Sequence, residues 1–566
     1  MSEISRRAFL ATITAGTGLA LVGCEGAVQQ SGSAKAREGI ITLGANPTPG
    51  QDSGTNQFVE NWNIYISAGG AAPAVGLIWE PLFRITNKEG GTLAPVLGES
   101  VKYSADGKTA TYKLRQDVTW SDGERFDAED VVYSYNEVFG PPKAGDATTF
   151  LRKKVYQTDD FTVVCEYNFP NTQQDTNLAL YYPILPQHVY AKQEDRGKFQ
   201  DKKPVGTGPC RLSTYSPQRI TLEVRDDYWG GRIEGVKKIE IVPHGTPANV
   251  QSAITKGDID WAMGGGPGVA KTFTGMDPAN AYHVYPSGST RGVQFQCSTA
   301  PFDNEQLRIA FRDAVDPTVI QASINTGYEI PTAAGLSPLL FANMLTAPYD
   351  KPMVQNVDSA KAALAESGYA VEDGVLTKDG KKYPLTLDVN LNEKEDIVAG
   401  PVLCSQWKQV LGVDVKYNGL SDKTFNDNLA KHKYRLVIFG TTFNGSPYNT
   451  YQAYLLENLD PAKQAMGYGN QGLWPISDEG NELLHDLKEI PRDDLDKTAD
   501  LIRRLQVIFG DSAPVIPYQG LGAQVLWTTK NWNGFPLPDA VDDFRPQFDS
   551  YGDPVQTIKV LAPNRT

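Results

Sequence analysis

The sequence predicts an α/β protein with mixed sheets and more than one lobe. Segments with the two-residue alternation of strands and segments with the periodicity of amphipathic helices follow one another through the body of the chain. The chain has 566 residues, of which 40% are hydrophobic, so it can bury two or more cores. Because the segments are short, we expect both parallel and antiparallel pairing of strands.

The N-terminal segment is expected to be an export signal. Arg6 and Arg7 precede an uncharged apolar run over residues 8–22, which is too short to span a bilayer. The paired arginines resemble those of a twin-arginine signal. We therefore expect residues 1–23 to be a signal peptide.

A lipid-attachment site is expected directly after this signal. The four residues that end at Cys24, Leu-Val-Gly-Cys, resemble the bacterial lipobox, whose cysteine is acylated. Residues 24–37 are small and polar, as in a flexible tether. We expect Cys24 to anchor the protein to the outer face of the cytoplasmic membrane.

Composition argues against several kinds of partner and site. The formal net charge is −14 and no basic run is present, so nucleic acid is not expected as a partner. The five histidines are scattered without an i,i+4 pair, so neither a metal nor a cofactor is expected. The remaining cysteines could be buried thiols or disulfides whose pairing the sequence does not select: Cys165, Cys210, Cys297 and Cys404.

The first clear elements lie between residues 110 and 138. Residues 110–120 have strand character and lead into the turn Ser-Asp-Gly. The helix that follows is expected to be capped by Asp127, with Asp130 completing a capping-box variant. Its apolar stripe is predicted to be Ala128, Val131, Tyr135 and Val138.

Further helices and strands are predicted between residues 305 and 420. Leu307, Ala310, Phe311 and Ala314 recur at the spacing of an amphipathic helix. A second helix should start with Asp316 as its cap and Pro317 in its first turn. A short helix that stops at Gly368, a turn with an alternating strand, and a helix that passes through Gly412 into a strand should follow.

Residues 263–273, MGGGPGVAKTF, come close to the phosphate-binding loop G-x-x-x-x-G-K-[ST], with Lys271 and Thr272 in the positions of the lysine and the hydroxyl. Ala270 stands where that loop requires a glycine, and Pro267 removes one of the backbone amides. An exported protein also meets essentially no ATP. We therefore expect a Gly-rich turn without a phosphate-binding role.

Four stretches carry motifs that occur together in one family of transport proteins. They are LAPVLGESVKYSADGKTATYKLRQDVTWSDGERFDAEDVVYSYNEV, PVGTGPCRL, DDYWGGRIEGVKKIEIVP and APFDNEQLRIAFRDAVDPTVI. In this order they resemble the extracytoplasmic solute-binding proteins of oligopeptide and dipeptide ABC importers, although Cys210 replaces the usual aromatic residue. The likeness spans roughly residues 40–560.

The resemblance implies a two-lobed periplasmic-binding-protein (Venus-flytrap) fold with an extra inserted domain. The expected segments are residues 38–75, 205–300 and 525–566 for domain I, 76–204 for domain II, and 301–524 for domain III. Crossover strands near Ser298–Phe302 and Gly520–Val525 would form the hinge. A solute that touches both lobes only in the closed form would shift the population to the form that the importer recognises.

The ligand is not fixed by the resemblance. In peptide-binding relatives an aspartate in a W-x-x-D-Y-x-[DE]-P-like loop pairs with the peptide ammonium, but the equivalent residues 437–455 contain no carboxylate. Either another acid does this or the ligand has no free amine. Peptide remains the family default, and a neutral oligosaccharide is the alternative. The candidate ligand-binding residues are Trp62, Tyr65, Thr441, Thr442, Phe443, Asn444 and Tyr448.

Other functional classes have weaker support in the sequence. No G-x-S-x-G motif, no H-E-x-x-H motif and no pair of catalytic carboxylates appears, so an enzyme is not expected, and an exported hydrolase stays as the alternative from another class. A receptor that senses a solute with the same trap is a further alternative. A nickel or haem ligand is less favoured, because no His/Met cluster is visible. We expect a monomer that meets importer permease subunits at the membrane.

Overall fold

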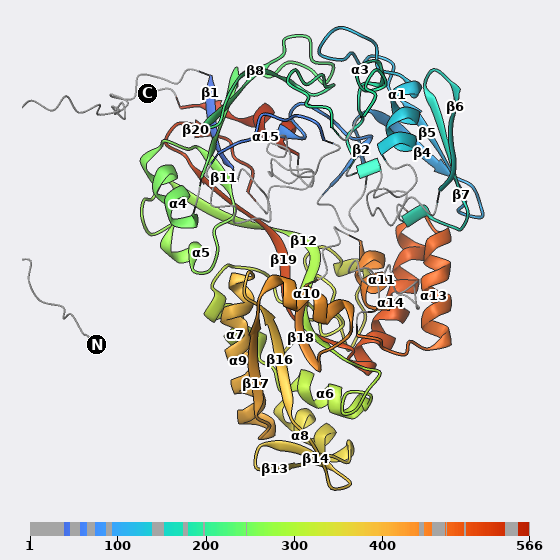
Figure 1. Cartoon of the computed structure of the whole chain (residues 1–566), viewed down its shortest axis with the longest axis vertical. Helices are drawn as coiled ribbons and strands as arrows, with labels where there is room; N and C mark the ends of the chain where they lie inside the picture. Colours follow the sequence, from blue (N-terminus) through green and yellow to red (C-terminus); the bar gives the residue numbers. More distant parts are fainter. Residues whose placement is uncertain are drawn as a thin grey trace, which may run out of the picture. The chain divides into compact units, whose positions relative to one another are not determined.

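A ten-stranded mixed sheet runs through the fold (Figure 1). In this computed structural model the strands lie in the order β17-β16-β18-β12-β19-β11-β1-β10-β9-β8. Their bounds are β1 Ile40–Ala45, β8 Cys210–Ser216, β9 Arg219–Val224, β10 Lys238–Pro243, β11 Trp261–Met263, β12 Asn280–Phe295, β16 Leu385–Asn390, β17 Val415–Leu420, β18 Leu436–Gly440 and β19 Val515–Thr528. The structure describes residues 39–45, 57–64, 74–86, 93–138, 152–173, 179–180, 182–195, 198–244, 246–440, 446–455, 470, 472–491, 494–537 and 553–564.

The sheet contains two groups of parallel strands joined by two long antiparallel ones. β16 pairs in parallel with β17 and β18, and β1 pairs in parallel with β10 and β11. Between these groups, β12 and β19 pair antiparallel with each other over most of their length. The mixed pairing predicted from the sequence is confirmed.

Smaller sheets and helices complete the described part of the chain. A four-stranded sheet has the order β4-β5-β7-β6, and the other small sheets are β13-β14-β15, β2-β3 and β20-β21. The strand bounds are β2 Phe83–Ile85, β3 Leu93–Pro95, β4 Gly98–Tyr103, β5 Thr109–Leu114, β6 Arg152–Asp159, β7 Thr162–Tyr167, β13 Ala370–Glu372, β14 Val375–Lys378, β15 Lys381–Tyr383, β20 Trp532–Asn533 and β21 Ala562–Pro563. The helix bounds are α1 Ala128–Tyr133, α3 Gln187–Tyr190, α4 Pro247–Lys256, α5 Val269–Thr272, α6 Glu305–Asp313, α7 Pro317–Ile324, α8 Val357–Glu366, α9 Lys394–Leu411, α10 Asp422–Ala430, α11 Pro447–Leu455, α13 Asp478–Glu489, α14 Leu495–Ser512 and α15 Pro554–Val560, with a π-helix at Ser134–Val138 and a 3-10 helix at Ala342–Met344.

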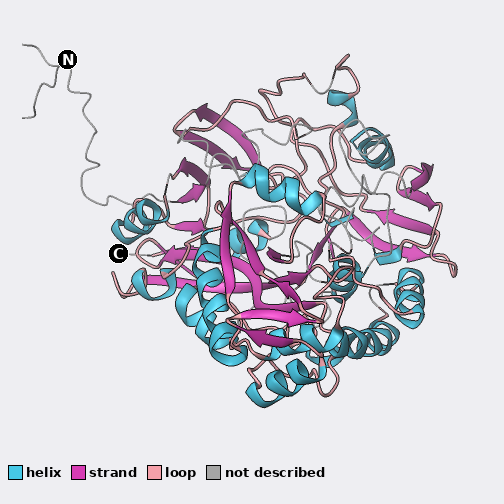
Figure 2. Cartoon of the chain, turned by 60° about the horizontal axis from the view of Figure 1, so that its bottom comes forward, coloured by secondary structure: helices cyan, strands magenta, loops and turns pink. Residues whose placement is uncertain are grey.

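Three large hydrophobic cores organise these elements. The first core gathers buried residues between 293 and 518, including residues of α6 and α9. Figure 2 shows helices lying along the strands of the chain. The second core combines residues 41–79 with residues 185–285 and 525–561. The third core lies within residues 82–184, under the four-stranded sheet. The second core therefore combines segments that are far apart in the sequence.

The helix starts agree closely with the sequence predictions. Asp127 caps α1, and the side chain of Asp130 accepts from the backbone of Asp127, which makes the capping box. Leu307 and Phe311 of α6 are buried as predicted, but the cap of α6 is Asn304. Asp316 caps α7, and Pro317 is in its first turn.

Two local predictions differ from the structure. The strand predicted over residues 110–120 is β5, which ends at Leu114, and Thr119 makes only an isolated bridge to Arg125. Residues 298–302 contain no strand, since β12 ends at Phe295 and a turn follows. The long crossing strand therefore precedes the segment that the family resemblance suggested, whereas residues 520–525 do lie within β19.

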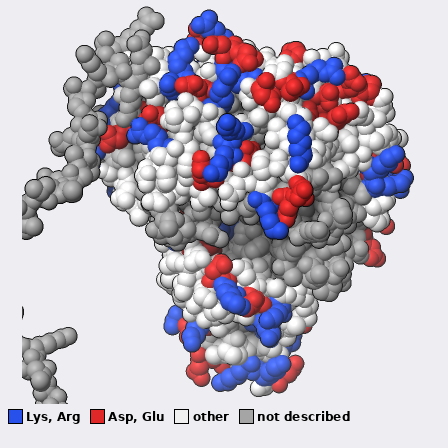
Figure 3. All heavy atoms as spheres, turned by 45° about the horizontal axis from the view of Figure 1, so that its top comes forward, with Lys and Arg blue, Asp and Glu red and all other residues white. Residues whose placement is uncertain are grey.

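The thiols, the surface charges and the hydropathy of the helices describe the remaining features of the body. Cys210, Cys297 and Cys404 are free thiols, and burial raises the pKa of Cys297 to about 12 and that of Cys404 to about 11. On the face drawn in Figure 3, lysine and arginine side chains lie among acidic ones. None of the helices in the described ranges has the length and hydropathy of a membrane span.

Candidate functional site

The two groups of parallel strands point their carboxyl ends toward each other. The last residue of β18, Gly440, pairs with Arg291 of β12. The last residue of β11, Met263, pairs with Val525 of β19, which itself pairs with His283 of β12. Because β11 and β18 run in opposite directions, their ends face across the stretch of β12 between His283 and Arg291. In open α/β sheets, ligands bind outside the carboxyl ends of the strands.

The strand pair is irregular in this stretch. The register of β12 against β19 shifts between Pro286 and Thr290. Such bulges re-aim side chains and bend strands, and they are common next to binding sites. The facing strand ends and this bulge therefore identify the candidate functional site.

The Gly-rich loop after β11 forms one wall of the site. Gly264, Gly266 and Gly268 have φ values of 79°, 70° and 81°, a left-handed conformation that favours glycine. The amide of Gly264 donates to the carbonyl of Gln524 at 2.8 Å, and the amide of Gly266 donates to its side-chain Oε1 at 3.0 Å. The loop thus uses these two amides to hold Gln524, a residue of β19.

The start of α9 brings carboxylates to the site. Arg291 of β12 donates to Asp396 at 3.0 Å and to Glu393 at 3.2 Å. Gln519 and Gln524 of β19 donate to the two carboxylate oxygens of Glu395 at 3.0 and 3.2 Å. We call the group Arg291, Glu393, Glu395, Asp396, Gln519 and Gln524 the crossing cluster.

Burial decides the ionisation of the crossing cluster. Desolvation raises the pKa of Asp396 to about 7, although the nearby Arg291 guanidinium acts in the opposite direction. Desolvation also raises the pKa of Glu395, against the effects of Arg291 and of the two glutamine donors. The cluster therefore holds three carboxyl groups against one guanidinium, in surroundings where charge is costly.

Several buried polar atoms near the crossing strands have no hydrogen-bond partner among the described residues. They include Oε1 of Gln519, the hydroxyl of Tyr518 and Nε of Arg291. An unpaired buried polar group costs about 1–3 kcal/mol, so a solute or water that satisfied these atoms would be favoured. The site thus has donors and acceptors available for a ligand.

The candidate residues from the sequence lie only partly within the described chain. Trp62 is fully buried in the second core, and Tyr448 is 1% exposed in the first core. The indole Nε1 of Trp62 and the hydroxyl of Tyr448 have no hydrogen-bond partner in the described structure. The structure therefore does not bring these two side chains into one core.

The other candidates lie outside the described residues: Tyr65, Thr441, Thr442, Phe443, Asn444 and Cys24. In the sequence, Thr441 directly follows Gly440, the last residue of β18. Sequence reasoning missed the crossing cluster, because acids at the start of a helix are explained by the helix dipole alone. The one usable signal was Arg291, which is the single Lys, Arg, Asp or Glu residue in β12.

A small contact joins the third core to the first core, away from the crossing strands. The hydroxyl of Thr172 donates to the carbonyls of Lys488 and Ile490 at 2.9 and 2.5 Å, and Gln173 donates to that of Ile490 at 3.0 Å. A Cβ at Gly107 would lie 3.0 Å from the Cα of Glu489. We call these residues the rim contact.

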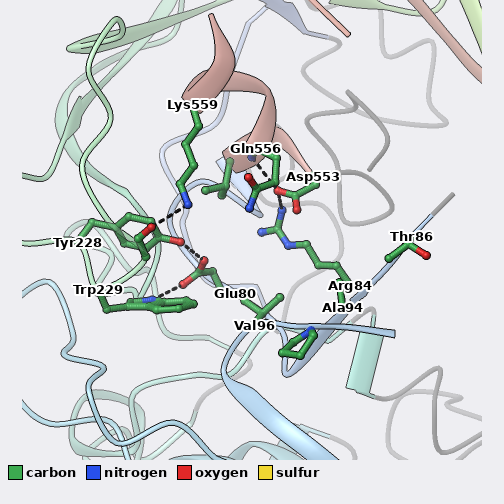
Figure 4. Close-up of a pocket in the computed structure, with 13 residues that line it drawn as sticks. Glu80, Arg84, Thr86, Ala94, Val96, Tyr228, Trp229, Asp553, Gln556 and Lys559 are labelled. Carbon is green, nitrogen blue, oxygen red and sulfur yellow. Dashed lines mark hydrogen bonds and ion pairs between the residues drawn. The ribbon is translucent and has the colours of Figure 1, made fainter. Parts of the chain in front are cut away.

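A second cluster fixes the third core to the second core (Figure 4). Glu80, 1% exposed, accepts from the Tyr228 hydroxyl at 2.7 Å and from the Trp229 indole at 2.9 Å. Arg84 pairs with Asp553, the cap of α15. We call these five residues the junction cluster.

The junction cluster lines a cavity of about 530 Å³. Figure 4 shows Glu80 directed at Tyr228 and Trp229 and Arg84 directed at Asp553. Lys559 donates to the carbonyl of Gly230 at 2.8 Å. These groups are satisfied by the protein itself. We therefore interpret the junction cluster as a structural joint rather than a ligand site. No group of His, Cys, Asp and Glu that could hold a metal occurs among the described residues.

Comparison with known proteins identifies relatives of the chain. The family model described as bacterial extracellular solute-binding proteins, family 5 (middle), matches residues 92–460. The oligopeptide-binding protein OppA of Bacillus subtilis is 25% identical over 446 residues, covering 74% of this chain and 78% of that protein. The nickel-binding periplasmic protein of Escherichia coli is 25% identical over 471 residues, covering 80% of this chain and 85% of that protein.

Solved structures show the same fold. The periplasmic oligopeptide-binding protein of an oligopeptide ABC transporter from Thermotoga maritima superposes with a TM-score of 0.76 at 19% identity, covering 93% of this chain and 100% of that one. The same protein with bound mannohexaose gives a TM-score of 0.68 at 20% identity, with coverage of 94% and 100%. The neighbours are two-lobed periplasmic binding proteins.

Proposed function

The chain belongs to family 5 of the bacterial extracellular solute-binding proteins, and from that premise we propose that it captures an oligopeptide between two closing lobes and delivers it to a membrane permease. It is the substrate-binding component of a peptide-type ABC importer family and has the two-lobed fold. The observation that carries the proposal is the pair of facing strand ends, with unpaired buried polar atoms between them.

The domain division is part of the proposal. Domain I would comprise residues 38–75, 205–300 and 525–566, domain II residues 76–204, and domain III residues 301–524. The three hydrophobic cores support this division, because each is built mainly from the residues of one domain. Limited proteolysis should cut first at exposed segments between these domains.

We also propose that Cys24 is acylated and that residues 24–37 tether the body to the outer face of the cytoplasmic membrane. The extracellular family supports export. A radiolabelled acyl chain should enter the wild-type protein in its natural host and be absent from Cys24→Ala. Label in both proteins would reject Cys24 as the attachment site.

Peptide is the proposed ligand because the crossing cluster has an excess of carboxyl groups. A neutral oligosaccharide is the second candidate, and one observation favours it: a structural neighbour holds mannohexaose. Mass spectrometry of the solute that co-purifies should separate the two. In thermal unfolding, the correct solute at 100 times its dissociation constant should add about 2.7 kcal/mol to the stability of the folded state.

The proposed ligand contacts are Trp62, Tyr65, Thr441, Thr442, Phe443, Asn444 and Tyr448. Phe443→Ala and Asn444→Ala should weaken binding and leave the unfolding transition unchanged. Unchanged affinity in both variants would show that the ligand does not bind at the residues that follow β18.

We infer that the protein is not an enzyme, since its relatives are named for the solutes that they bind. Incubation with panels of peptides and glycans should leave each substrate intact. Turnover would establish the hydrolase alternative. Uptake of the solute by cells that carry the neighbouring permease genes would distinguish an importer component from a sensing receptor.

A further inference from the structure

We propose that Glu395 and Gln519 form a subsite for a positively charged N–H group of the ligand, an ammonium or a guanidinium. This inference rests on the proposed function, because it assumes that the solute lies between the facing strand ends. It goes further by naming the chemical group that the solute presents there and the residues that receive it.

The charges of the crossing cluster are the first support. Arg291, its one guanidinium, is occupied by Asp396 and Glu393. Among the described residues, the hydrogen bonds to the Glu395 carboxylate come from neutral amides, those of Gln519 and Gln524. Burial raises the free energy of this carboxylate, and a cationic partner would offset that cost. Arg291 acts on Glu395 through its charge but forms its ion pairs with the other two acids, so within the described chain Glu395 is the carboxyl group of the cluster without an ion pair.

Gln519 is the second, independent support. Its side chain is fully buried, its Nε2 is committed to Glu395, and its Oε1 has no partner among the described residues. A donor that approached Glu395 beside this amide would meet two acceptors, a carboxylate oxygen and a carbonyl oxygen. Ammonium and guanidinium groups carry only donors, so they match this pair of acceptors.

Gln524 fixes the geometry of the subsite. Its Nε2 donates to Glu395 at 3.2 Å and to the Tyr328 hydroxyl at 2.7 Å, while its Oε1 accepts from the Gly266 amide at 3.0 Å. Both amide hydrogens of Gln524 are therefore in use, and its side-chain oxygen accepts one hydrogen bond. Gln524 holds Glu395 in place, and the acceptor on Gln519 stays available.

Solvent can reach this part of the cluster. Glu395 is only partly buried, and the side chain of Glu393, two residues before it, is 47% exposed. A neutral hydroxyl-rich solute would leave Glu395 without a counter-charge, and an anionic solute would be repelled. A cationic group fits the carboxylate of Glu395, the unpaired oxygen of Gln519 and the access of solvent to this part of the cluster.

The test measures binding of four tripeptides by calorimetry: tri-alanine, N-acetyl-tri-alanine, Ala-Lys-Ala and N-acetyl-Ala-Lys-Ala. The wild-type protein should bind the peptides that carry an ammonium more tightly than the acetylated tri-alanine. Comparing the two acetylated peptides shows whether a side chain can supply the cation. Comparing the two alanine peptides shows whether the N-terminus supplies it.

Glu395→Gln should weaken the cation-bearing peptides by at least about tenfold and change N-acetyl-tri-alanine by less than about twofold. The matched control is Glu366→Gln, the same substitution at an exposed position of α8, which should bind like the wild type. Unfolding curves of both variants establish that they are folded.

Two results would overturn the subsite. If the wild type binds these peptides and Glu395→Gln binds them equally well, the proposed function stands and the subsite is wrong. If the wild type binds none of the four peptides and binds mannohexaose, with or without Glu395, then the peptide proposal and the subsite both fail.

Discussion

The junction cluster and the rim contact both attach the core within residues 82–184 to other parts of the chain, and they do so in opposite ways. In the junction cluster, the buried carboxylate of Glu80 receives two side-chain donors, and Arg84 pairs with Asp553. The rim contact consists of two polar side chains that donate to carbonyls at the end of α13.

The difference indicates which of the two contacts can open. Separating the two sides of the junction cluster would leave buried charged groups without their partners or expose them to solvent, which costs several kcal/mol. Separating the rim leaves Thr172, Gln173 and the carbonyls at the end of α13 free to bond with water, so each bond contributes only about 1 kcal/mol. We therefore expect the third core to move with the second as one body, and to open against the first at the rim.

The largest expected effect comes from breaking the junction. Glu80→Ala should lower the free energy of unfolding by about 3 kcal/mol or more, because the Tyr228 hydroxyl and the Trp229 indole lose their shared acceptor in a buried place. Chemical denaturation measures this loss. A loss below about 1 kcal/mol would show that the junction cluster does not act as a structural joint.

The pH dependence of the unfolding free energy also tests the role of Glu80 in the junction cluster. Burial raises the pKa of Glu80 above its ordinary value of 4.5. Since the folded-state pKa is the higher one, the stabilisation by protonated Glu80 is complete below about pH 4.5 and is lost as the pH rises toward the folded-state pKa.

Relative to Glu80→Gln, the wild type should therefore lose unfolding free energy as the pH rises over this range, by at most about 1.4 kcal/mol per pH unit. Denaturation curves of both proteins, collected between pH 4 and pH 8, measure the difference. Parallel pH profiles would contradict the assignment to Glu80.

A steric change tests the rim. Gly107 has a φ of 64°, and an added Cβ would lie 3.0 Å from the Cα of Glu489. Gly107→Ala should weaken solute binding about fivefold, because full closure would force the two surfaces apart.

Gly123→Ala is the matched control for the rim. Gly123 has a φ of 96°, so an alanine there is also strained, but an added Cβ meets no atom of the described residues within 4 Å. Both variants should lose about 1 kcal/mol of stability, and only Gly107→Ala should lose affinity. Equal affinities in the two variants would show that the rim contact has no role in solute binding.

The smallest expected effect is the loss of one rim donor. Thr172→Val keeps the shape of the side chain and removes the hydroxyl that bonds to Lys488 and Ile490. Solute affinity should fall about threefold to fivefold, with little change in the unfolding transition. A loss of stability as large as that of Glu80→Ala would show that the rim is a permanent joint.

Local structure was predictable where neighbouring residues decide it. The caps at Asp127 and Asp316 and the buried face with Leu307 and Phe311 follow from short-range patterns, and the structure has them. Residues 298–302 were assigned to a crossing strand by family analogy, and the strand itself ends at Phe295.

The crossing cluster was not predictable, because its members meet only through long-range strand pairing. Arg291 and Glu395 lie about a hundred positions apart, and Gln519 is more than a hundred positions further along the chain. The family resemblance points to residues 437–455 for the counter-charge, and these residues contain no acid. The carboxylates stood instead at the start of α9, where the helix dipole already explained them.

The central claim is tested most directly by two distances measured with the solute that co-purifies. One fluorophore pair, at Lys108→Cys and Asp486→Cys in a Cys404→Ser background, spans the rim; a second pair, at Lys102→Cys and Arg232→Cys, spans the junction. We predict that solute shortens the distance between the fluorophores across the rim and leaves the distance across the junction unchanged. A rim distance that is the same with and without solute, or a junction distance that changes as much, would contradict this prediction.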